Sequence, residues 1–327
     1  MKAVQFKFGG DHSIVKVPSP TPRSDEVLVK VQYSALDTSH EAVLNKTIPG
    51  YFIHTLKEPL YLGYHYCGTV EEIGADVDTT SDTGLTKGSE VFGFLQCVPS
   101  QTQGAFAEYI TVKATDCAVK PAGVSSQIAA ASATEAITAL QAIFNLGGLD
   151  KGQHILIVGA GGGVGSAAVQ IAKQLGATVT AVCSTKDVDR VQQQWGADTV
   201  VDRTVDPQYT TTLLQEGVRF DVILDACNAL PASATKLLKP KGAIVNTIPT
   251  FTFMWNKIKT LISSKRVYFV ECHSTKSDLD LIGKWLDEGH LDIPIDSTFK
   301  VRDMQSAMAK HAGRKTGRVS IQVEDAW

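Results

Sequence analysis

A glycine-rich run, Val-Gly-Ala-Gly-Gly-Gly-Val-Gly, occupies residues 158–165. It follows the apolar run His154–Val158, typical of a buried strand, and precedes the helix-like segment Ser166–Leu175. In a strand–turn–helix unit, backbone N–H groups and the helix N-terminus face an anion, and glycine brings no Cβ atoms that would hold a phosphate away. A second strand predicted at Thr178–Cys183 completes the context of a dinucleotide site. Without that context, the run would be an ordinary surface turn.

Four loop residues are the expected contacts of the dinucleotide pyrophosphate: Gly159, Gly162, Gly163 and Val164.

The turn after the second predicted strand indicates which dinucleotide binds. NAD sites usually place an acidic residue about 20 positions beyond the loop, whereas an adenosine phosphate requires that place to be free of negative charge. Here the chain has Ser184, Thr185 and Lys186. Asp187 and Asp189 read as early residues of the next helix, where the helix dipole favours them. The turn therefore favours NADPH, and the alternative is that Lys186 is a solvated charge at a helix start.

Size and composition indicate an intracellular enzyme. A chain of 327 residues with 43% apolar content can bury two cores. With 31 basic and 34 acidic residues, the net charge of -3 argues against nucleic acid as a partner. The chain has neither an apolar run of membrane-spanning length nor the apolar core of a secretion signal at its start. Its 6 cysteines lack a CxxC pair, which fits reduced thiols and a cytoplasmic location.

The two parts of the chain differ in pattern. Residues 1–120 contain short alternating apolar runs broken by Pro and Gly, as in antiparallel strands of a barrel-like domain. From about residue 125, helices and strands alternate, which predicts an α/β doubly wound parallel sheet. The segment from Ser297 onward returns to the first pattern and is expected to fold back onto the N-terminal domain. We predict one domain from 1–124 with 274–327 and a second from 125–273.

The predicted helices are Gln127–Phe144, Ser166–Leu175, Val188–Trp195 and Asp278–Glu288, and the later strands are Asp221–Asp225, Ala243–Thr247 and Val267–Glu271.

Several short motifs stand in a specific order and spacing along the chain. They include Leu62-Gly63, Gly68-Thr69-Val70, the run from Gly104 to Tyr109, and Gly196-Ala197-Asp198. Together with the glycine loop, they resemble a zinc-independent member of the medium-chain dehydrogenase/reductase superfamily, in its quinone oxidoreductase and enoyl reductase branch. The resemblance implies a GroES-like, mostly-β catalytic domain, a Rossmann domain and a cleft that holds the nicotinamide.

Side-chain chemistry argues against a metal. On this resemblance, the zinc ligands of zinc-using relatives fall on Asp37, Tyr64 and Thr134, and a phenol and a threonine hydroxyl are poor zinc ligands. The four cysteines of the relatives' structural zinc lobe are also missing. A makeshift site of Asp37, His40, His65 and Glu135 lacks a recognisable ligand spacing. We expect no metal, which disfavours alcohol dehydrogenation.

The remaining chemistry is hydride transfer from NADPH to a quinone or to an α,β-unsaturated carbonyl compound, an enone or enal. Neither acceptor needs a metal, because hydrogen bonds and a proton can meet the charge that develops on oxygen. Tyr51 matches loosely the tyrosine that donates a proton in related enoyl reductases, and it could equally be a loop aromatic. The candidate catalytic residues are Tyr51, Asp37 and Tyr64. For His65 and Glu135, we favour a packing role.

Three further residues are candidates for cofactor contacts. Thr138 lies where family members bring a hydroxyl near the nicotinamide. Cys227 follows a predicted strand at the edge where adenine would lie, although a buried small thiol is its commoner explanation. Ile248 ends another strand at the ligand-binding edge, where we expect backbone contacts.

Two segments suggest partners other than the small-molecule substrate. The run Arg266–Glu271 reads as an edge strand, and such strands commonly pair across a twofold axis in this family, so we expect a homodimer. Phe251–Ile262 is apolar with interleaved lysines. We favour a place in the substrate cleft or the dimer contact over a membrane surface for this short segment.

Two other functions stay open. One is an enoyl-thioester reductase that acts on a CoA-bound or carrier-bound substrate. The other is a catalytically idle protein that senses NADPH or serves as a scaffold, which the unusual Asp37 and Glu135 keep in view.

Overall fold

The computed structural model describes residues 1–47, 49–80, 84–261 and 263–327. The chain forms two compact units. The first unit comprises Met1–Thr134, His273–Gly289 and Ile293–Trp327, and the second comprises Glu135–Cys272 and His290–Asp292. The boundary falls inside helix α3 (Ser126–Leu140). The domain limits predicted above, 1–124 with 274–327 and 125–273, stay a proposal.

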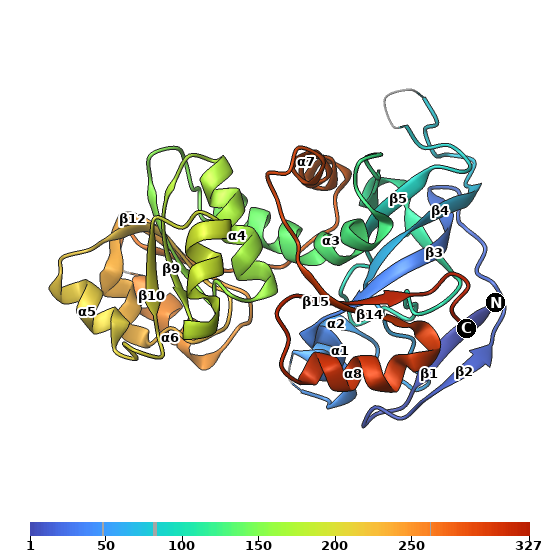
Figure 1. Ribbon diagram of the computed structural model, residues 1–327, viewed down its shortest axis with the longest axis horizontal. Coiled ribbons are helices and arrows are strands. Elements are labelled where there is room, and N and C mark those ends of the chain that lie inside the picture. Colours follow the sequence, from blue (N-terminus) through green and yellow to red (C-terminus); the bar gives the residue numbers. More distant parts are fainter. Residues whose placement is uncertain (48, 81–83, 262) are drawn as a thin grey trace. The chain divides into compact units, whose positions relative to one another are not determined.

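A mostly antiparallel sheet organises the first unit (Figure 1). The order of hydrogen-bonded strands across this sheet is β14-β15-β3-β4-β5-β7, and β6 also pairs with β3. Strand β15 pairs antiparallel with β3, with Val319 opposite Leu36, so the end of the chain joins the N-terminal domain as predicted. The strands are β1 (Lys2–Phe6), β2 (His12–Lys16), β3 (Glu26–Leu36), β4 (His65–Ile73), β5 (Glu90–Phe94), β6 (Tyr109–Lys113), β7 (Cys117–Val119), β14 (Ile295–Lys300) and β15 (Arg318–Gln322).

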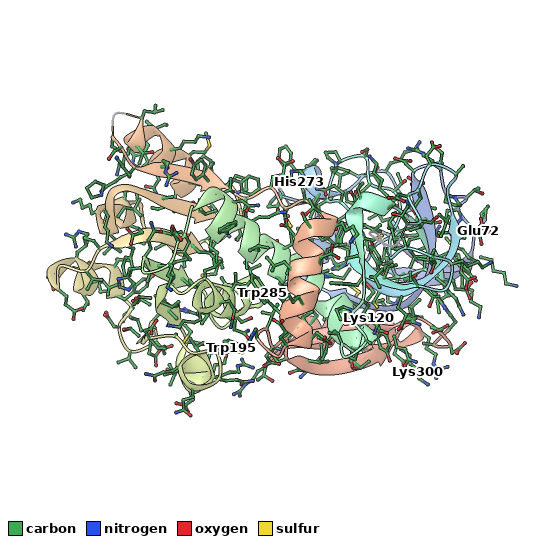
Figure 2. The ribbon with its side chains drawn as sticks, turned by 90° about the horizontal axis from the view of Figure 1, so that it is seen from above. Glu72, Lys120, Trp195, His273, Trp285 and Lys300 are labelled. Atoms are coloured by element: carbon green, nitrogen blue, oxygen red, sulfur yellow. The ribbon has the colours of Figure 1, made fainter. Side chains whose placement is uncertain are left out.

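Short helices surround this sheet. They are α1 (Thr38–Leu44), α2 (Gly50–Ile53), η1 (Ala114–Asp116), α7 (Lys276–Asp287), η6 (Val301–Asp303) and α8 (Met304–Ala312). Buried apolar side chains from β3, including Val27, Val29 and Val31, form one core with Phe106. Lys120, labelled in Figure 2, is buried and donates from Nζ to the carbonyl of Val124 at 2.7 Å.

The second unit is the predicted doubly wound sheet. All six strands are parallel, in the order β10-β9-β8-β11-β12-β13. Helix α4 lies on one side of the sheet and α5 and α6 lie on the other (Figure 1). The elements are β8 (His154–Val158), α4 (Gly163–Gln174), β9 (Thr178–Cys183), η3 (Thr185–Asp187), β10 (Thr199–Asp202), α5 (Tyr209–Gln215), β11 (Phe220–Asp225), η5 (Ala232–Leu237), β12 (Leu238–Asn246), α6 (Phe251–Thr260) and β13 (Arg266–Phe269).

The strand registers align the carboxyl ends of neighbouring strands. Val158 lies opposite both Val182 and Asp225, and Asp225 lies opposite Asn246. Ligands bind at this edge in doubly wound sheets. The edge is therefore where we expect the predicted cofactor contacts.

Two predicted helices differ in detail. The helix predicted from Gln127 to Phe144 ends at Leu140 and continues as a π-helical turn, η2 (Gln141–Leu146). The helix predicted at 188–195 contains the π-helical turn η4 (Arg190–Gln194). Trp195, labelled in Figure 2, follows this turn, and its backbone N–H donates to the Arg190 carbonyl at 3.1 Å. The extra residue in such a turn is common at functional sites.

None of the helices in the described ranges has the length and apolarity needed to cross a membrane.

Candidate functional site

The glycine loop joins β8 to α4 in the second unit. The N–H groups of Gly159 and Ala160 both donate to the carbonyl of Val182 at 3.0 Å, which ties the loop to the neighbouring strand. Gly159 has a φ of 88°, a conformation that favours glycine. Gly162 is the N-cap of α4 and provides no side-chain cap. The first N–H groups of α4, from Gly163 and Val164 onward, are thus left for an anion.

Two close approaches show how tightly the loop is enclosed. A Cβ on Gly165 would lie 2.2 Å from the Gly159 carbonyl oxygen, so glycine is required for the helix to meet the loop. A Cβ on Gly159 would lie 3.0 Å from Cys227 Sγ. Cys227 is therefore beside the loop, and it is exposed rather than buried as its commoner explanation supposed.

The turn after β9 combines cationic and anionic groups. Ser184 is half-buried, Thr185 and Lys186 are exposed, and Asp187 is buried. Ser184 Oγ donates to Asp187 Oδ2 at 2.9 Å, and Arg190 Nη2 donates to Oδ1 at 3.0 Å. The sequence places Asp187 at a helix start, and the structure adds that its carboxylate is enclosed and paired with a cation.

Arg203 is a candidate that sequence reasoning missed. It directly follows β10, and its N–H donates to the carbonyl of Cys183 at 2.9 Å, so this exposed residue stands beside the Ser184 turn. Burial raises the pKa of Cys183 to about 11, while the nearby Arg203 charge acts in the opposite direction. The sequence shows a basic residue directly after a short apolar run. The structure adds that this run is a strand paired with β9.

The other two cofactor candidates also lie in the second unit. Ile248 follows β12 at the carboxyl edge, where the preceding Thr247 donates its N–H to the Asp225 carbonyl at 3.3 Å. Thr138 lies in α3 and is 7% exposed. The edge therefore gathers the glycine loop, Cys227, the Ser184 turn and Ile248, while Thr138 comes from a separate helix.

A polar cluster centred on Asp37 lies within the first unit. Asp37 caps α1 by accepting from the Ser39 N–H at 2.8 Å, and its Oδ2 lies 2.8 Å from Nε2 of His65. His40 Nδ1 lies 3.0 Å from Asp37 Oδ1. Burial alone would raise the pKa of Asp37, but the charges and hydrogen bonds of His40 and His65 hold it well below its usual range.

The cluster extends to two more residues. Thr134 Oγ1 lies 3.2 Å from Nδ1 of His65, and Arg318 Nη2 lies 3.3 Å from Nε2 of the same ring. His65 is fully buried, whereas Thr134 is half-buried.

The other two catalytic candidates lie differently. Tyr64 is fully buried, its ring centroid lies 5.2 Å from that of His40, and its hydroxyl has no hydrogen-bond partner in the described part of the chain. Burial raises the pKa of Tyr64 well above its usual range. Tyr51 lies in α2 and is 51% exposed. The described residues include no hydrogen bond from Tyr51 to Asp37 or Tyr64. Asp37 therefore belongs to the cluster, Tyr64 borders it and Tyr51 does not join it.

The makeshift metal site can be compared with these contacts. Asp37, His40 and His65 do come together, and the carboxylate of Asp37 contacts one ring nitrogen of each histidine. Within the described ranges, no group of three His, Cys, Asp or Glu residues has an arrangement that could hold a metal ion.

Two domain families match the chain. An alcohol dehydrogenase GroES-like domain matches residues 23–122, and a zinc-binding dehydrogenase family matches residues 195–319. Zinc is part of that family's description, whereas this chain has Asp37, Tyr64 and Thr134 at the positions assigned above to zinc ligands.

Individual relatives extend the match over the full length. The chain is 28% identical to a chloroplast envelope quinone oxidoreductase homolog of Arabidopsis thaliana, over 98% of both chains. It is 29% identical to the trans-enoyl reductase pgmF of Aspergillus terreus, over 93% of this chain and 88% of the relative. A solved quinone oxidoreductase from Coxiella burnetii superposes with a TM-score of 0.84 and 26% identity, over 99% of each chain.

Proposed function

The chain belongs to the medium-chain dehydrogenase/reductase superfamily, in its quinone oxidoreductase and enoyl reductase branch, and we propose that it transfers hydride from NADPH to a quinone or enone without a metal. A nicotinamide cofactor and oxidoreductase activity follow from the family. The observation that carries the metal-free part is the Asp37–His65–Thr134 cluster, whose polar atoms bond to one another. These contacts engage the carboxylate of Asp37 and the hydroxyl of Thr134, two of the three positions assigned to zinc ligands, which supports a reaction without zinc.

We assign the cofactor contacts as follows. Gly159, Gly162, Gly163 and Val164 hold the pyrophosphate at the start of α4. Ser184, Thr185 and Lys186 receive the adenosine phosphate, with Arg203 as a second cation. Because Arg190 already pairs with Asp187, the carboxylate of that turn repels a phosphate less than an unpaired one would. Thr138, Cys227 and Ile248 contact the rest of the cofactor.

The acceptor must be electron-poor and conjugated. When bound, the nicotinamide supplies a hydride, and the negative charge that results on the acceptor oxygen needs hydrogen bonds and a proton. Buried Asp37 and Tyr64 shape the polar surroundings, and half-exposed Tyr51 remains a proposed proton donor. Reduction of a quinone and reduction of an enone both place negative charge on an acceptor oxygen.

An enoyl-thioester reductase is the second candidate, because a full-length relative is named a trans-enoyl reductase. A CoA-bound enoyl substrate that is reduced faster than free enones and quinones would favour it.

We also propose that two copies associate through β13 and that the protein acts in the cytoplasm. Strand β13 ends the order of its sheet. The neighbouring helix α6 exposes Phe251, Trp255 and Ile258. These residues belong to the apolar segment predicted at 251–262, whose last residue, Ile262, lies outside the described residues. An uncovered apolar edge of this kind favours pairing with a second copy.

Rapid mixing of the NADPH-loaded protein with a panel of quinones and enones tests the proposed function. We expect loss of the reduced-nicotinamide absorbance with at least one acceptor class. Tight NADPH binding with no oxidation by any acceptor would contradict it and favour the idle sensor or scaffold.

A further inference from the structure

Thr134, His65 and Asp37 form a continuous series of polar contacts within the first unit. The Thr134 hydroxyl oxygen is 3.2 Å from Nδ1 of His65, and Nε2 on the other side of the ring is 2.8 Å from Asp37 Oδ2. His65 is fully buried and Asp37 is 7% exposed, whereas Thr134 is half-buried. A partly accessible hydroxyl is thus backed by a buried imidazole and a buried carboxylate.

The chemistry of the groups fixes where the ring protons lie. An ionised carboxylate only accepts hydrogen bonds, and the pKa of Asp37 is held well below its usual range, so Nε2 of His65 carries a proton toward it. Arg318 Nη2 is 3.3 Å from the same nitrogen, but a guanidinium cannot accept a proton. Asp37 is therefore the acceptor for Nε2, and Nδ1 faces Thr134.

We propose that Thr134, His65 and Asp37 form a proton relay that completes the reduction of an enone after hydride transfer. The proposal rests on the proposed function. In this relay Thr134, in place of Tyr51, is the catalytic residue, because its hydroxyl gives the proton to the substrate oxygen. His65 and Asp37 are positioning residues that act through Thr134.

The step balances with water as the final proton source. Hydride adds to the β-carbon of the enone, and the electron pair of the C=C bond moves to make an enolate. The relay starts with His65 protonated on both ring nitrogens, with the second proton, taken from water, on Nδ1 toward the Thr134 oxygen. The Thr134 O–H bond breaks and its proton goes to the enolate oxygen, while the Thr134 oxygen takes the Nδ1 proton of His65. The imidazolium becomes a neutral imidazole that keeps its Nε2 proton toward Asp37. Water then reprotonates the ring, and the released enol tautomerises to the saturated ketone.

The relay predicts a contrast between acceptors. An enolate is strongly basic and needs its proton within the site, whereas a hydroquinone anion can leave and take a proton from water. Loss of the relay should therefore slow enone reduction more than quinone reduction.

Thr134→Val tests the relay, since valine has nearly the shape of threonine and lacks the hydroxyl. With NADPH-loaded protein, we expect enone turnover to fall by at least about 100-fold, the size of a general-acid contribution, with NADPH affinity unchanged. Thr134→Ser, which restores a hydroxyl, should stay within roughly tenfold of the parent rate. Thr111→Val, at a buried threonine of β6, is the matched control and should keep the parent rate.

A second measurement does not depend on turnover. Nitrogen-15 spectra of labelled histidines in the cofactor-free protein, with His65→Gln to assign the ring, should show Nε2 protonated. Thr134→Val should shift the Nδ1 signal and leave Nε2 unchanged. An unprotonated Nε2 would overturn the relay.

The outcomes separate the two proposals. If the parent protein reduces enones and Thr134→Val loses less than about tenfold, the relay is overturned and the proposed function stands. If none of the quinones or enones oxidises NADPH bound to the parent protein, the proposed function fails and the relay fails with it.

Discussion

The carboxylate of Asp187 lies so close to Gly161 that a Cβ on this glycine would stand 2.5 Å from Oδ2. Because Ser184 and Arg190 hold that carboxylate, it cannot move aside without the loss of both hydrogen bonds. The glycine loop and the turn after β9 are thus in close contact at Gly161, where there is no room for a side chain.

Gly161→Ala should therefore destabilise the protein and weaken cofactor binding. Forced overpacking costs roughly 1–3 kcal/mol, so the free energy of unfolding in urea should fall by about that amount. Gly313→Ala is the control, since its Cβ would meet nothing closer than 3.3 Å. An unchanged unfolding free energy in Gly161→Ala would contradict the contact.

The cations around the same turn should set the cofactor preference. Lys186→Ala and Arg203→Ala should each raise the Kd for NADPH by about tenfold, the effect of losing one charge-assisted contact, and leave the Kd for NADH unchanged. Fluorescence titration measures both. Lys284→Ala, on the exposed surface of α7, is the control.

Asp187→Asn tests the opposing charge. Removal of the carboxylate takes away a negative charge and breaks its ion pair with Arg190, so the affinity ratio should move further toward NADPH. A shift of that ratio toward NADH would show that Asp187 favours the phosphate and would contradict our assignment of the turn.

Local pattern was enough to predict most elements of the second unit. The apolar run at His154–Val158 and the glycines after it gave the strand, loop and helix, because each depends on neighbours in the sequence. Arg203 was missed because its approach to Cys183 depends on which strands pair. The contacts of His65 with Asp37 and Thr134 span 28 and 69 residues. Only tertiary structure brings such groups together.

Two buried histidines should make stability fall in mild acid. Burial, and then the charge of Lys315, lowers the pKa of His311 to about 3, and burial lowers that of His54 to about 4. Both take up a proton at their ordinary pKa of 6.5 when the chain unfolds. The unfolded state thus binds more protons below pH 6.5, so the stabilisation is complete above that pH and is lost progressively toward the folded values.

The limiting slope is about 1.4 kcal/mol per pH unit for each histidine. Urea unfolding at a series of pH values measures it, and His311→Asn should reduce the slope. His290→Asn, at an exposed position, is the control and should not. Equal slopes in the parent protein and His311→Asn would exclude His311 as a source of acid sensitivity.

The proposed dimer depends on the edge strand β13. Phe269 at its end is 37% exposed, and an aspartate there would place a charge in an apolar contact. We expect light scattering to give twice the chain mass of 35.1 kDa for the parent protein and the single-chain mass for Phe269→Asp. Val205→Asp replaces a more exposed apolar residue away from β13 and should stay dimeric. A monomeric parent protein would refute the assembly.

Metal-free hydride transfer is tested most directly by one single-turnover experiment. The protein is dialysed against a chelator, checked for zinc, loaded with NADPH and mixed rapidly with an enone or a quinone. We predict that the reduced-nicotinamide absorbance disappears at the same rate before and after chelation. Loss of that reaction on chelation and its return with added zinc, or no oxidation of bound NADPH by any acceptor, would contradict the account.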